Sequence, residues 1–186
     1  MLSFSIASGL CSVGVDVIIL GVVPTPAVAY LVEKYKADAG IMISASHNPA
    51  EYNGIKIFSG DGYKIPDALE EQIETLVLDE EIPENLSGTD IGKVTYANNA
   101  VRDYVEHLKS TVMNSLDGLN IAVDCANGSA SVSAEMLFKE LGANADILHN
   151  KPNGININRN CGSTHIELLR EYVLSNKLDA GVAYDG

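Results

Sequence analysis

Alternation of strand-like and helix-like stretches constrains the fold of this chain more than any other feature. Residues 13–21 form a short run rich in Val and Ile, residues 26–36 have the pattern of a helix, and residues 37–44 are again apolar. Short apolar runs of this kind are typical of buried strands. Two strands joined through a helix by short loops form a βαβ unit, so the first part of the chain predicts an α/β module with a largely parallel or mixed sheet.

A second module of the same plan follows further along the chain. Its expected elements are a helix at 99–112, a strand at 119–125, a helix at 132–143, a strand at 145–150, a helix at 165–177 and a strand at 180–186. The predicted fold class is therefore α/β, with two consecutive α/β modules whose mixed, largely parallel sheets are flanked by helices.

The residues that follow the first βαβ unit predict a hairpin, a helix and a linker. Residues 53–65 alternate apolar and polar side chains around Ser-Gly-Asp-Gly, which indicates a hairpin. An acidic helix is expected at 66–79, with its charges on a solvated face. We expect a first domain over 1–83, a linker over 84–97 with two glycines and little periodicity, and a second domain over 98–186.

Composition excludes several classes of function. The net charge is −13, from 12 Lys and Arg against 25 Asp and Glu, which argues against a nucleic acid partner because phosphate binding needs a basic surface. No apolar run is long enough to span a bilayer, and the first residues lack the basic segment of a signal peptide. Cys11, Cys125 and Cys161 are odd in number and far apart, which favours a reducing, cytoplasmic setting and no metal cluster.

Three polar side chains are expected where ligands bind in α/β folds, beyond the carboxyl ends of strands. Ser46 follows the strand expected at 37–44, and Asp124 and Asp185 end strands of the second module. A serine hydroxyl is a weak nucleophile unless it is activated. From composition alone, a structural turn is the commoner role for Ser46, and capping a turn is the commoner role for Asp185.

The residues around Ser46 leave alternatives open. His47 is adjacent in sequence, so its side chain points in a different direction and the pair is not a dyad by spacing. Lys56 lies on a strand that can return past Ser46, where it could hold a phosphate or move a proton; the alternative is a surface lysine on a hairpin. The loop at 124–131 could cradle an anion, although it lacks the glycine motifs of nucleotide sites and a plain tight turn is the commoner role.

Taken together, these segments resemble a known family. Residues 46–49 (Ser-His-Asn-Pro) and 52–56 (Tyr-Asn-Gly-Ile-Lys) are similar to the active serine loop of the phosphohexomutase superfamily. Residues 122–131 and 181–186 resemble strands of that family's second domain. Residues 151–169, with Cys-Gly-Ser-Thr-His, are similar to its phosphoglucosamine mutase branch.

This resemblance implies a reaction and roles for particular residues. The implied reaction interconverts glucosamine 6-phosphate and glucosamine 1-phosphate through a bisphosphate, as a step toward peptidoglycan precursors. Ser46 would carry the phosphoryl group, and Lys56 would donate or accept a proton. His47 would line the transfer site, and Asn48 and Asn53 would contact the substrate or its phosphate. Phosphoryl transfer of this kind depends on positioning and charge neutralisation.

The resemblance also implies a metal and a longer protein. Mg²⁺ would be held by phosphorylated Ser46 and by Asp185, in a loop reading Asp-Gly-Asp-x-Asp-Arg of which Asp185-Gly186 is present. We expect most of domain one, incomplete at its N-terminus, and part of domain two, with its metal loop cut, and a chain that is inactive alone. The expected partner is a phosphosugar, with no nucleic acid and no membrane, and no oligomeric state is indicated. A phosphoglucomutase or phosphomannomutase fragment and a catalytically dead α/β remnant remain alternatives.

Overall fold

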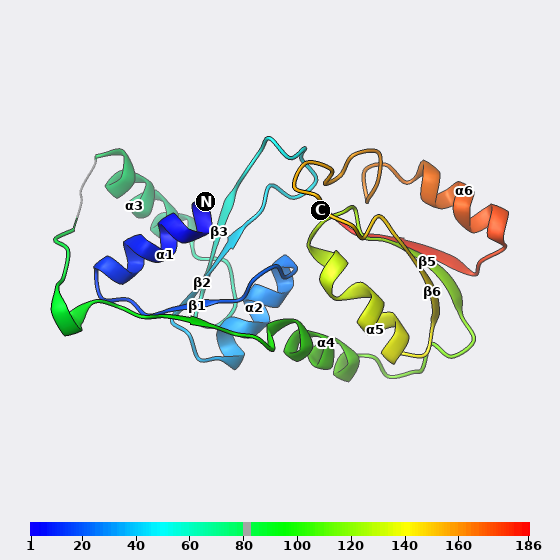
Figure 1. The fold of residues 1–186 in the computed structure, drawn as a ribbon, viewed down its shortest axis with the longest axis horizontal. Helices are drawn as coiled ribbons and strands as arrows, with labels where there is room; N and C mark the ends of the chain where they lie inside the picture. The colour runs from blue at the N-terminus through cyan, green and yellow to red at the C-terminus, as the bar shows by residue number, and fades with distance from the viewer. Residues whose placement is uncertain (80–82) are drawn as a thin grey trace.

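The computed structural model describes residues 1–79 and 83–186 of the chain. The elements form two α/β units that lie side by side along the long axis of the molecule (Figure 1). In chain order they are α1 (Leu2–Ser12), β1 (Val17–Ile19), α2 (Thr25–Lys34), β2 (Ala39–Ile43), β3 (Ile55–Ser59), α3 (Asp67–Leu78), η1 (Gly88–Asp90), β4 (Val94–Tyr96), α4 (Ala100–Thr111), β5 (Asn120–Asp124), η2 (Ser129–Val132), α5 (Ala134–Glu140), β6 (Asn144–Leu148), α6 (Glu167–Asn176) and β7 (Ala180–Ala183).

The first unit contains the expected strand–helix–strand connection, but its strands pair differently from a simple βαβ unit. Within the described residues, β1 pairs in parallel with β4, and β2 pairs in antiparallel with β3. The predicted hairpin turn is present after β3, where the Ser59 amide donates to the Tyr63 carbonyl at 2.8 Å. Its second arm is reduced to one bridge, between Phe58 and Lys64, because β3 pairs along its length with β2.

The segment expected as a linker, 84–97, contains η1 and β4. The pairing of β4 with β1 runs from Val94 opposite Val17 to Tyr96 opposite Ile19. The Gly92 amide also donates to the Cys11 carbonyl at 2.9 Å. This part of the chain therefore packs along the first unit before it reaches α4, a long-range contact that local periodicity does not predict.

The second unit follows the predicted plan closely. Its three strands are parallel in the order β6-β5-β7, and β5 is the central strand, with Val123 and Asp124 fully buried. Helix α5 packs against β6, and α6 packs against β5 and β7. The sheet is parallel because each strand is reached through a helix.

The described chain also contains the helix α1, which the sequence did not predict. Gly9 and five further small residues, Ser and Ala, give α1 weak amphipathic character, so the 3.6-residue signal is faint. The cysteines Cys11, Cys125 and Cys161 are free and buried. Among the described residues, no helix is both long and apolar enough to cross a membrane.

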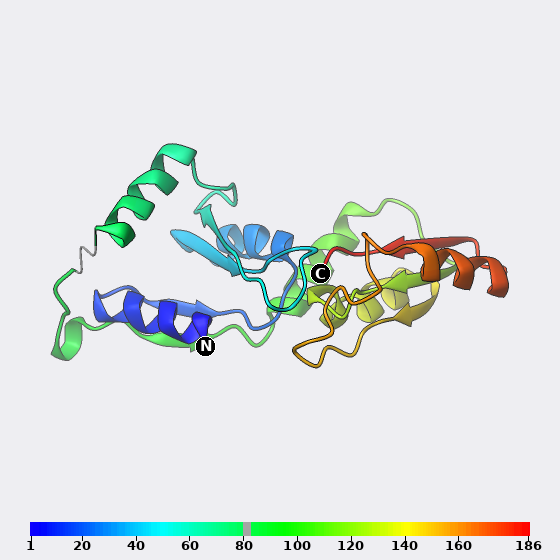
Figure 2. The same ribbon diagram turned by 90° about the horizontal axis from the view of Figure 1, so that it is seen from above.

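The core of the first unit lies between helices. Buried side chains of α2, including Val28, Leu31 and Val32, pack with Ala100 and Tyr104 of α4. In the second unit the buried cluster is centred on β5, with Ile121 and Val123. The acidic helix α3 has no buried residue and lies at the end of the molecule opposite α6 (Figures 1 and 2).

We expect Leu31→Ala to lower the free energy of unfolding by about 2–5 kcal/mol, because a buried leucine leaves a cavity when it is truncated. Leu31 is 1% exposed and belongs to the buried cluster shared by α2 and α4. Leu174→Ala is the matched control, since Leu174 lies on α6 and is 70% exposed, and it should change the free energy by at most about 0.5 kcal/mol. Urea denaturation followed by circular dichroism measures both, and equal losses would contradict the packing described here.

Candidate active site

Ser46 lies in a loop at the tip of the β2–β3 ribbon. The two strands pair up to Ile43 and Ile55, and the ladder is extended by the Ser44 amide, which donates to the Gly54 carbonyl at 2.9 Å. A side chain at Gly54 would meet that region closely, with its Cβ 2.9 Å from the Ser44 oxygen. The ribbon carries this loop toward the C-terminus of the chain in both views (Figures 1 and 2).

The backbone of Ser46 is in the left-handed region, with φ of 58°. This conformation is uncommon for a residue other than glycine, so the surroundings must stabilise it. The Ser46 amide donates to Ser44 Oγ at 3.1 Å, so the local turn contact expected of Ser46 is made by Ser44. Ser46 Oγ instead donates to the Asp185 carboxylate in the other unit.

Asn158 is a functional candidate that the sequence did not single out. Its Nδ2 donates to the carbonyl oxygens of Ser46, at 2.9 Å, and of Asn48, at 3.0 Å. Asn158 is 7% exposed, and its own φ is 57°. Its place in the polar loop between β6 and α6 was visible in the sequence, but a contact across 110 residues has no local signal.

The structure brings Lys56 near the Ser46 loop. Lys56 is half-buried on β3, opposite Met42, and its Nζ lies 3.4 Å from the Ser44 carbonyl oxygen. The lysine thus borders the loop, and its contact in this structure is with the main chain rather than with Ser46 Oγ. A cation at this place is suited to attract an anionic ligand.

The other predicted residues of the loop are exposed. His47, Asn48 and Asn53 all face solvent, and Asn48 Nδ2 donates to the Ala45 carbonyl at 3.0 Å. The hydroxyl of Ser46 bonds to Asp185 and not to His47, as expected for adjacent residues that point apart. Their side chains can therefore reach a ligand from outside the loop.

The carboxyl ends of strands from both units converge here, as the sequence predicted. Asp185 follows β7, and the Gly186 amide donates to its Oδ1 at 3.1 Å. The loop after β5 lies against the same place, because a Cβ at Gly128 would be 2.6 Å from the Gly186 carbonyl carbon. A cavity of about 1110 Å³ lies mainly in the first unit, and its lining reaches Ser46 and Asn48 and, from the second unit, Gly128 and Gly186.

Asp124 is a fully buried carboxylate behind this site. Its Oδ1 accepts the Ala126 amide at 2.9 Å, and its Oδ2 accepts the Gly162 amide at 3.0 Å. His149 Nδ1 lies 3.0 Å from Oδ1 but without hydrogen-bond geometry. The carboxylate thus ties together the loops that follow β5 and β6.

Asp124, His149 and Cys161 have the residue types and spacing of a metal site, with ligand atoms within 4.8 Å of one another. The chemistry of the group argues for a structural role. Burial, together with the charge of Asp124, raises the pKa of the Cys161 thiol, whereas a metal ligand must be a thiolate. Both carboxylate oxygens of Asp124 already accept main-chain amides.

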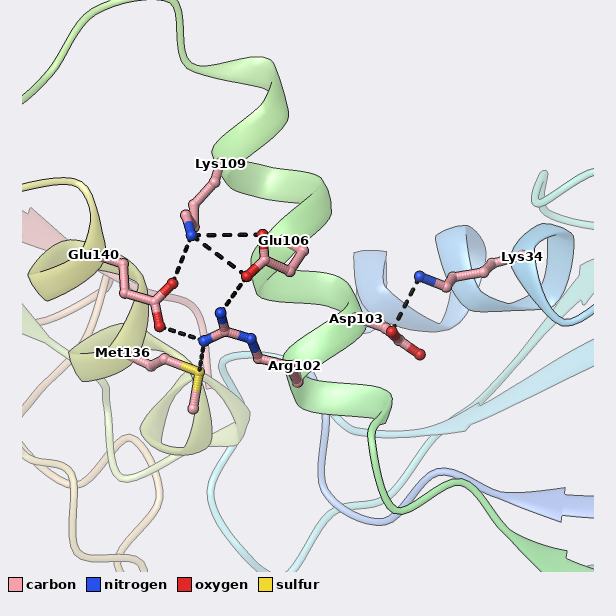
Figure 3. Close-up of polar contacts among 7 residues, drawn as sticks. All are labelled: Lys34, Arg102, Asp103, Glu106, Lys109, Met136 and Glu140. Carbon is pink, nitrogen blue, oxygen red and sulfur yellow. Dashed lines mark hydrogen bonds and ion pairs between the residues drawn. The ribbon is translucent and has the colours of Figure 1, made fainter.

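Helix α4 fixes the relative position of the two units. Toward the first unit, Asp103 pairs with Lys34 at 3.1 Å (Figure 3) and accepts the Tyr35 hydroxyl at 2.7 Å. These contacts, the hydrogen bond from Tyr35 first, lower the pKa of the Asp103 carboxyl. The rings of Tyr30 and His107 stack with their centroids 3.9 Å apart.

Toward the second unit, α4 makes ion pairs with α5. Lys109 Nζ lies 2.7 Å from Glu140 Oε2, and the Arg102 guanidinium pairs with both Glu140 and Glu106 (Figure 3). Arg102 also contacts Met136 Sδ at 3.7 Å. The hydrogen bonds from Lys109 and then Arg102 lower the pKa of the Glu140 carboxyl.

Comparisons with known proteins give the family. Residues 1–83 match the family described as phosphoglucomutase/phosphomannomutase, alpha/beta/alpha domain I. The whole chain is 54% identical to a phosphoglucosamine mutase of Clostridium beijerinckii and 50% identical to one of Acetivibrio thermocellus, and it covers 42% of each. A crystal structure of a phosphoglucomutase/phosphomannomutase family protein from Burkholderia thailandensis superposes with a TM-score of 0.84 at 25% identity, over all of this chain and 41% of that one.

The α/β fold and the serine loop thus resemble those of the phosphohexomutase superfamily, and the model of its first domain matches residues 1–83. Within it, the similarity over the whole chain is to phosphoglucosamine mutases, and the chain spans 42% of the length of those relatives. The resemblance inferred from the sequence is confirmed, and so is the predicted α/β fold class.

We expect the contribution of Glu140 to stability to disappear in acid. The pKa of Glu140 is lowered from its usual 4.5 in the folded state, so its contribution is complete above that value and is lost as the pH falls through the lowered value. The difference in melting temperature between the wild type and Glu140→Gln should therefore be present at neutral pH and shrink below pH 4.5. Glu135→Gln, on the same helix, is the control without these partners. A Glu140→Gln difference that stays constant with pH would contradict the role given to the ion pairs.

Proposed function

We propose that this chain provides the phosphoryl-carrying serine and part of the metal site of a phosphoglucosamine mutase, an isomerase that interconverts glucosamine 6-phosphate and glucosamine 1-phosphate. The observation that carries the proposal is the hydrogen bond from Ser46 Oγ to Asp185. It places the hydroxyl of the serine motif against the carboxylate that follows a strand of the second unit. The similarity to phosphoglucosamine mutases over the whole chain supports the choice of sugar.

The proposed reaction consists of two phosphoryl transfers, and each transfer moves a different phosphoryl group. A sugar hydroxyl attacks the phosphorus of phosphorylated Ser46; the new O–P bond forms as the bond to Ser46 Oγ breaks, and the sugar becomes a bisphosphate. After the bisphosphate turns around, Ser46 Oγ attacks its other phosphate and the product leaves. Each transfer removes a proton from the attacking hydroxyl, and we assign Lys56, at the border of the loop, to donate or accept it.

The exposed residues of the loop are assigned to substrate contact. The side chains of His47, Asn48 and Asn53 are exposed and can meet a phosphosugar from the solvent side. Asn48 and Asn53 also line the cavity beside Ser46. Neutral donors of this kind can orient a phosphate without fixing it permanently.

The oxygen donors at Ser46 and Asp185 fit a hard cation such as Mg²⁺. Phosphorylation of Ser46 would place a phosphate dianion against the Asp185 carboxylate that its hydroxyl now contacts, and two adjacent anions are stable only with a cation between them. When bound, Mg²⁺ would neutralise charge on the transferring phosphate. Ser46 and Asp185 would hold it, and Asp185 keeps the serine oxygen in place.

We further assign residues 1–83 to the first domain of the mutase, 84–97 to the segment between domains and 98–186 to part of the second domain. The first of these ranges includes residues 80–82, which lie outside the described part of the chain. We place the protein in the cytoplasm, in the synthesis of amino-sugar precursors of peptidoglycan. The net charge of −13 argues against a nucleic acid partner, so we assign the binding of the anionic substrate to groups at the site itself.

We predict that Ser46→Ala abolishes nearly all mutase activity while the fold is retained, because the phosphoryl carrier is removed. The measurement uses the 186 residues within a chain of the length of the relatives, with glucosamine 6-phosphate as substrate. Intact mass after incubation with glucosamine 1,6-bisphosphate shows whether one phosphoryl group is gained. Ser44→Ala is the control on the same loop. Loss of activity in Ser44→Ala with normal activity in Ser46→Ala would reassign the carrier.

Activity toward glucose 1-phosphate or mannose 1-phosphate, in place of the amino sugar, would favour the phosphoglucomutase or phosphomannomutase alternative. A longer wild-type chain that acts on none of these sugars and gains no phosphoryl group would favour the catalytically dead remnant.

A second prediction concerns Mg²⁺. Magnesium demands near-octahedral oxygen coordination, and the described residues offer Ser46 and Asp185 at this place. We expect residues 1–186 to bind Mg²⁺ weakly and without defined stoichiometry in calorimetric titration. A chain extended past Gly186 by about ten residues, a common loop length, should bind one ion, and Asp185→Asn in that chain should remove it. Tight, stoichiometric binding by residues 1–186 would show that other residues build the site.

A further inference from the structure

We propose that Asn158 is a positioning residue that holds the Ser46 loop in its reactive conformation, and that the buried Asp124 carboxylate anchors Asn158. The positioning itself does not depend on the proposed function. Its consequence for phosphoryl transfer rests on that function, and the experiments below separate the two.

The first argument is the contact between Asn158 and the loop. Its single Nδ2 group donates to two carbonyls, those of Ser46 and Asn48, on both sides of His47. Among the described residues, these are the hydrogen bonds that the second unit makes to the main chain of this loop. An amide NH₂ has two donors, and both are used, so the side chain fixes the distance between the two carbonyls as well as their direction.

The second argument is the conformation that this contact stabilises. Ser46 has φ of 58°, a region in which the Cβ of a residue other than glycine comes too close to the following carbonyl oxygen. The contact from the Ser46 amide to Ser44 Oγ lies within the loop and moves with it. Asn158 holds the loop from the other unit, so the direction of Ser46 Oγ toward Asp185 is set by the second unit.

The third argument is the support of Asn158 itself. The main-chain amide of Asn158 donates to the Ala126 carbonyl at 2.9 Å. The main-chain amide of Ala126 in turn donates to Asp124 Oδ1 at 2.9 Å. The other oxygen of Asp124 accepts the Gly162 amide at 3.0 Å, so one buried carboxylate ties both neighbouring loops. Hydrogen bonds to a buried charge are among the stronger ones, which makes this a rigid base for the Asn158 side chain.

The residue type fits the role. Asn adopts the left-handed conformation more readily than most residues, and Asn158 has φ of 57°. Its side chain is a neutral donor, so it can bind two carbonyls beside a serine that becomes a phosphate dianion without adding charge. An aspartate of the same size would present oxygens to those carbonyls and to the phosphate, and would repel both.

The test compares Asn158→Gly with Asn160→Gly in residues 1–186. Glycine keeps the left-handed backbone open at both positions and removes only the side chain. Asn160 is the matched control because it lies in the same loop, has φ of 55° and is exposed. Hydrogen–deuterium exchange is measured over residues 45–53, together with the melting temperature of each variant.

We expect exchange of the amides in 45–53 to become at least about tenfold faster in Asn158→Gly and to stay near wild type in Asn160→Gly. A loop whose Ser46 and Asn48 carbonyls are no longer held opens more often, and its amides exchange through that local opening. Asn158→Asp should be at least as fast as Asn158→Gly, because it adds repulsion where glycine only removes the donors. Equal exchange in Asn158→Gly and Asn160→Gly would overturn the positioning role. So would accelerated exchange spread evenly over both units, which would indicate a general loss of stability.

A second measurement addresses transfer in a chain of the length of the relatives. If the proposed function holds, Asn158→Gly should lower kcat by about 10–100-fold with little change in KM, as misplacement of a reacting group does, and Asn160→Gly should leave both unchanged. A normal kcat in Asn158→Gly would overturn the consequence for transfer. A wild type inactive on phosphosugars would refute the proposed function and leave the exchange result standing as the test of Asn158.

Discussion

The double attachment of α4 is the constraint on which the candidate site depends. Ser46 belongs to the first unit and Asp185 to the second, so their contact exists only while the units keep one relative position. Helix α4 is packed against α2 through Ala100 and Tyr104 and is joined to α5 through Glu140. Exposed ion pairs of this kind contribute little singly. Here the ion pairs share their acceptors, and the apolar side of the same helix is buried. The packing of this side therefore sets the relative orientation of the two units, and the ion pairs add to it.

The conformation of the Ser46 loop also depends on both units. A loop at the tip of a two-stranded ribbon has few neighbours of its own, and a left-handed serine there is disfavoured locally. The compensating contacts come from Asn158 and Asp185, more than 100 residues away in the chain. The conformation of Ser46 is thereby coupled to the docking of the second unit.

The sequence predicted the elements better than it predicted their partners. The strands β5, β6 and β7 and the helices α2, α3 and α6 follow from local periodicity. Ser46 and Asp185 were placed at strand ends, where ligands bind in α/β folds, and the roles expected for them came from the family resemblance and stay predictions. The pairing of β4 with β1 and the clamp of Asn158 are long-range contacts without a local pattern. Helix α1 was missed because its small residues give a faint periodic signal. Motif reasoning finds residues that react, whereas residues that position them are found from contacts.

Charge presents the remaining physical problem, since an acidic chain is proposed to hold an anionic substrate. Helix α3 carries four acidic residues and no basic one and lies at the opposite end of the molecule from α6 (Figures 1 and 2). At physiological ionic strength, exposed charges are screened beyond about 8 Å. The charges close to the site therefore decide whether an anionic substrate can bind there. Arg102 and Lys109 are committed to Glu106 and Glu140, whereas Lys56 borders the serine loop and contacts only a carbonyl oxygen there. The single positive charge of a lysine does not balance the negative charges of Asp185 and a phosphate dianion. In the proposed function, the site therefore requires a further cation when Ser46 is phosphorylated.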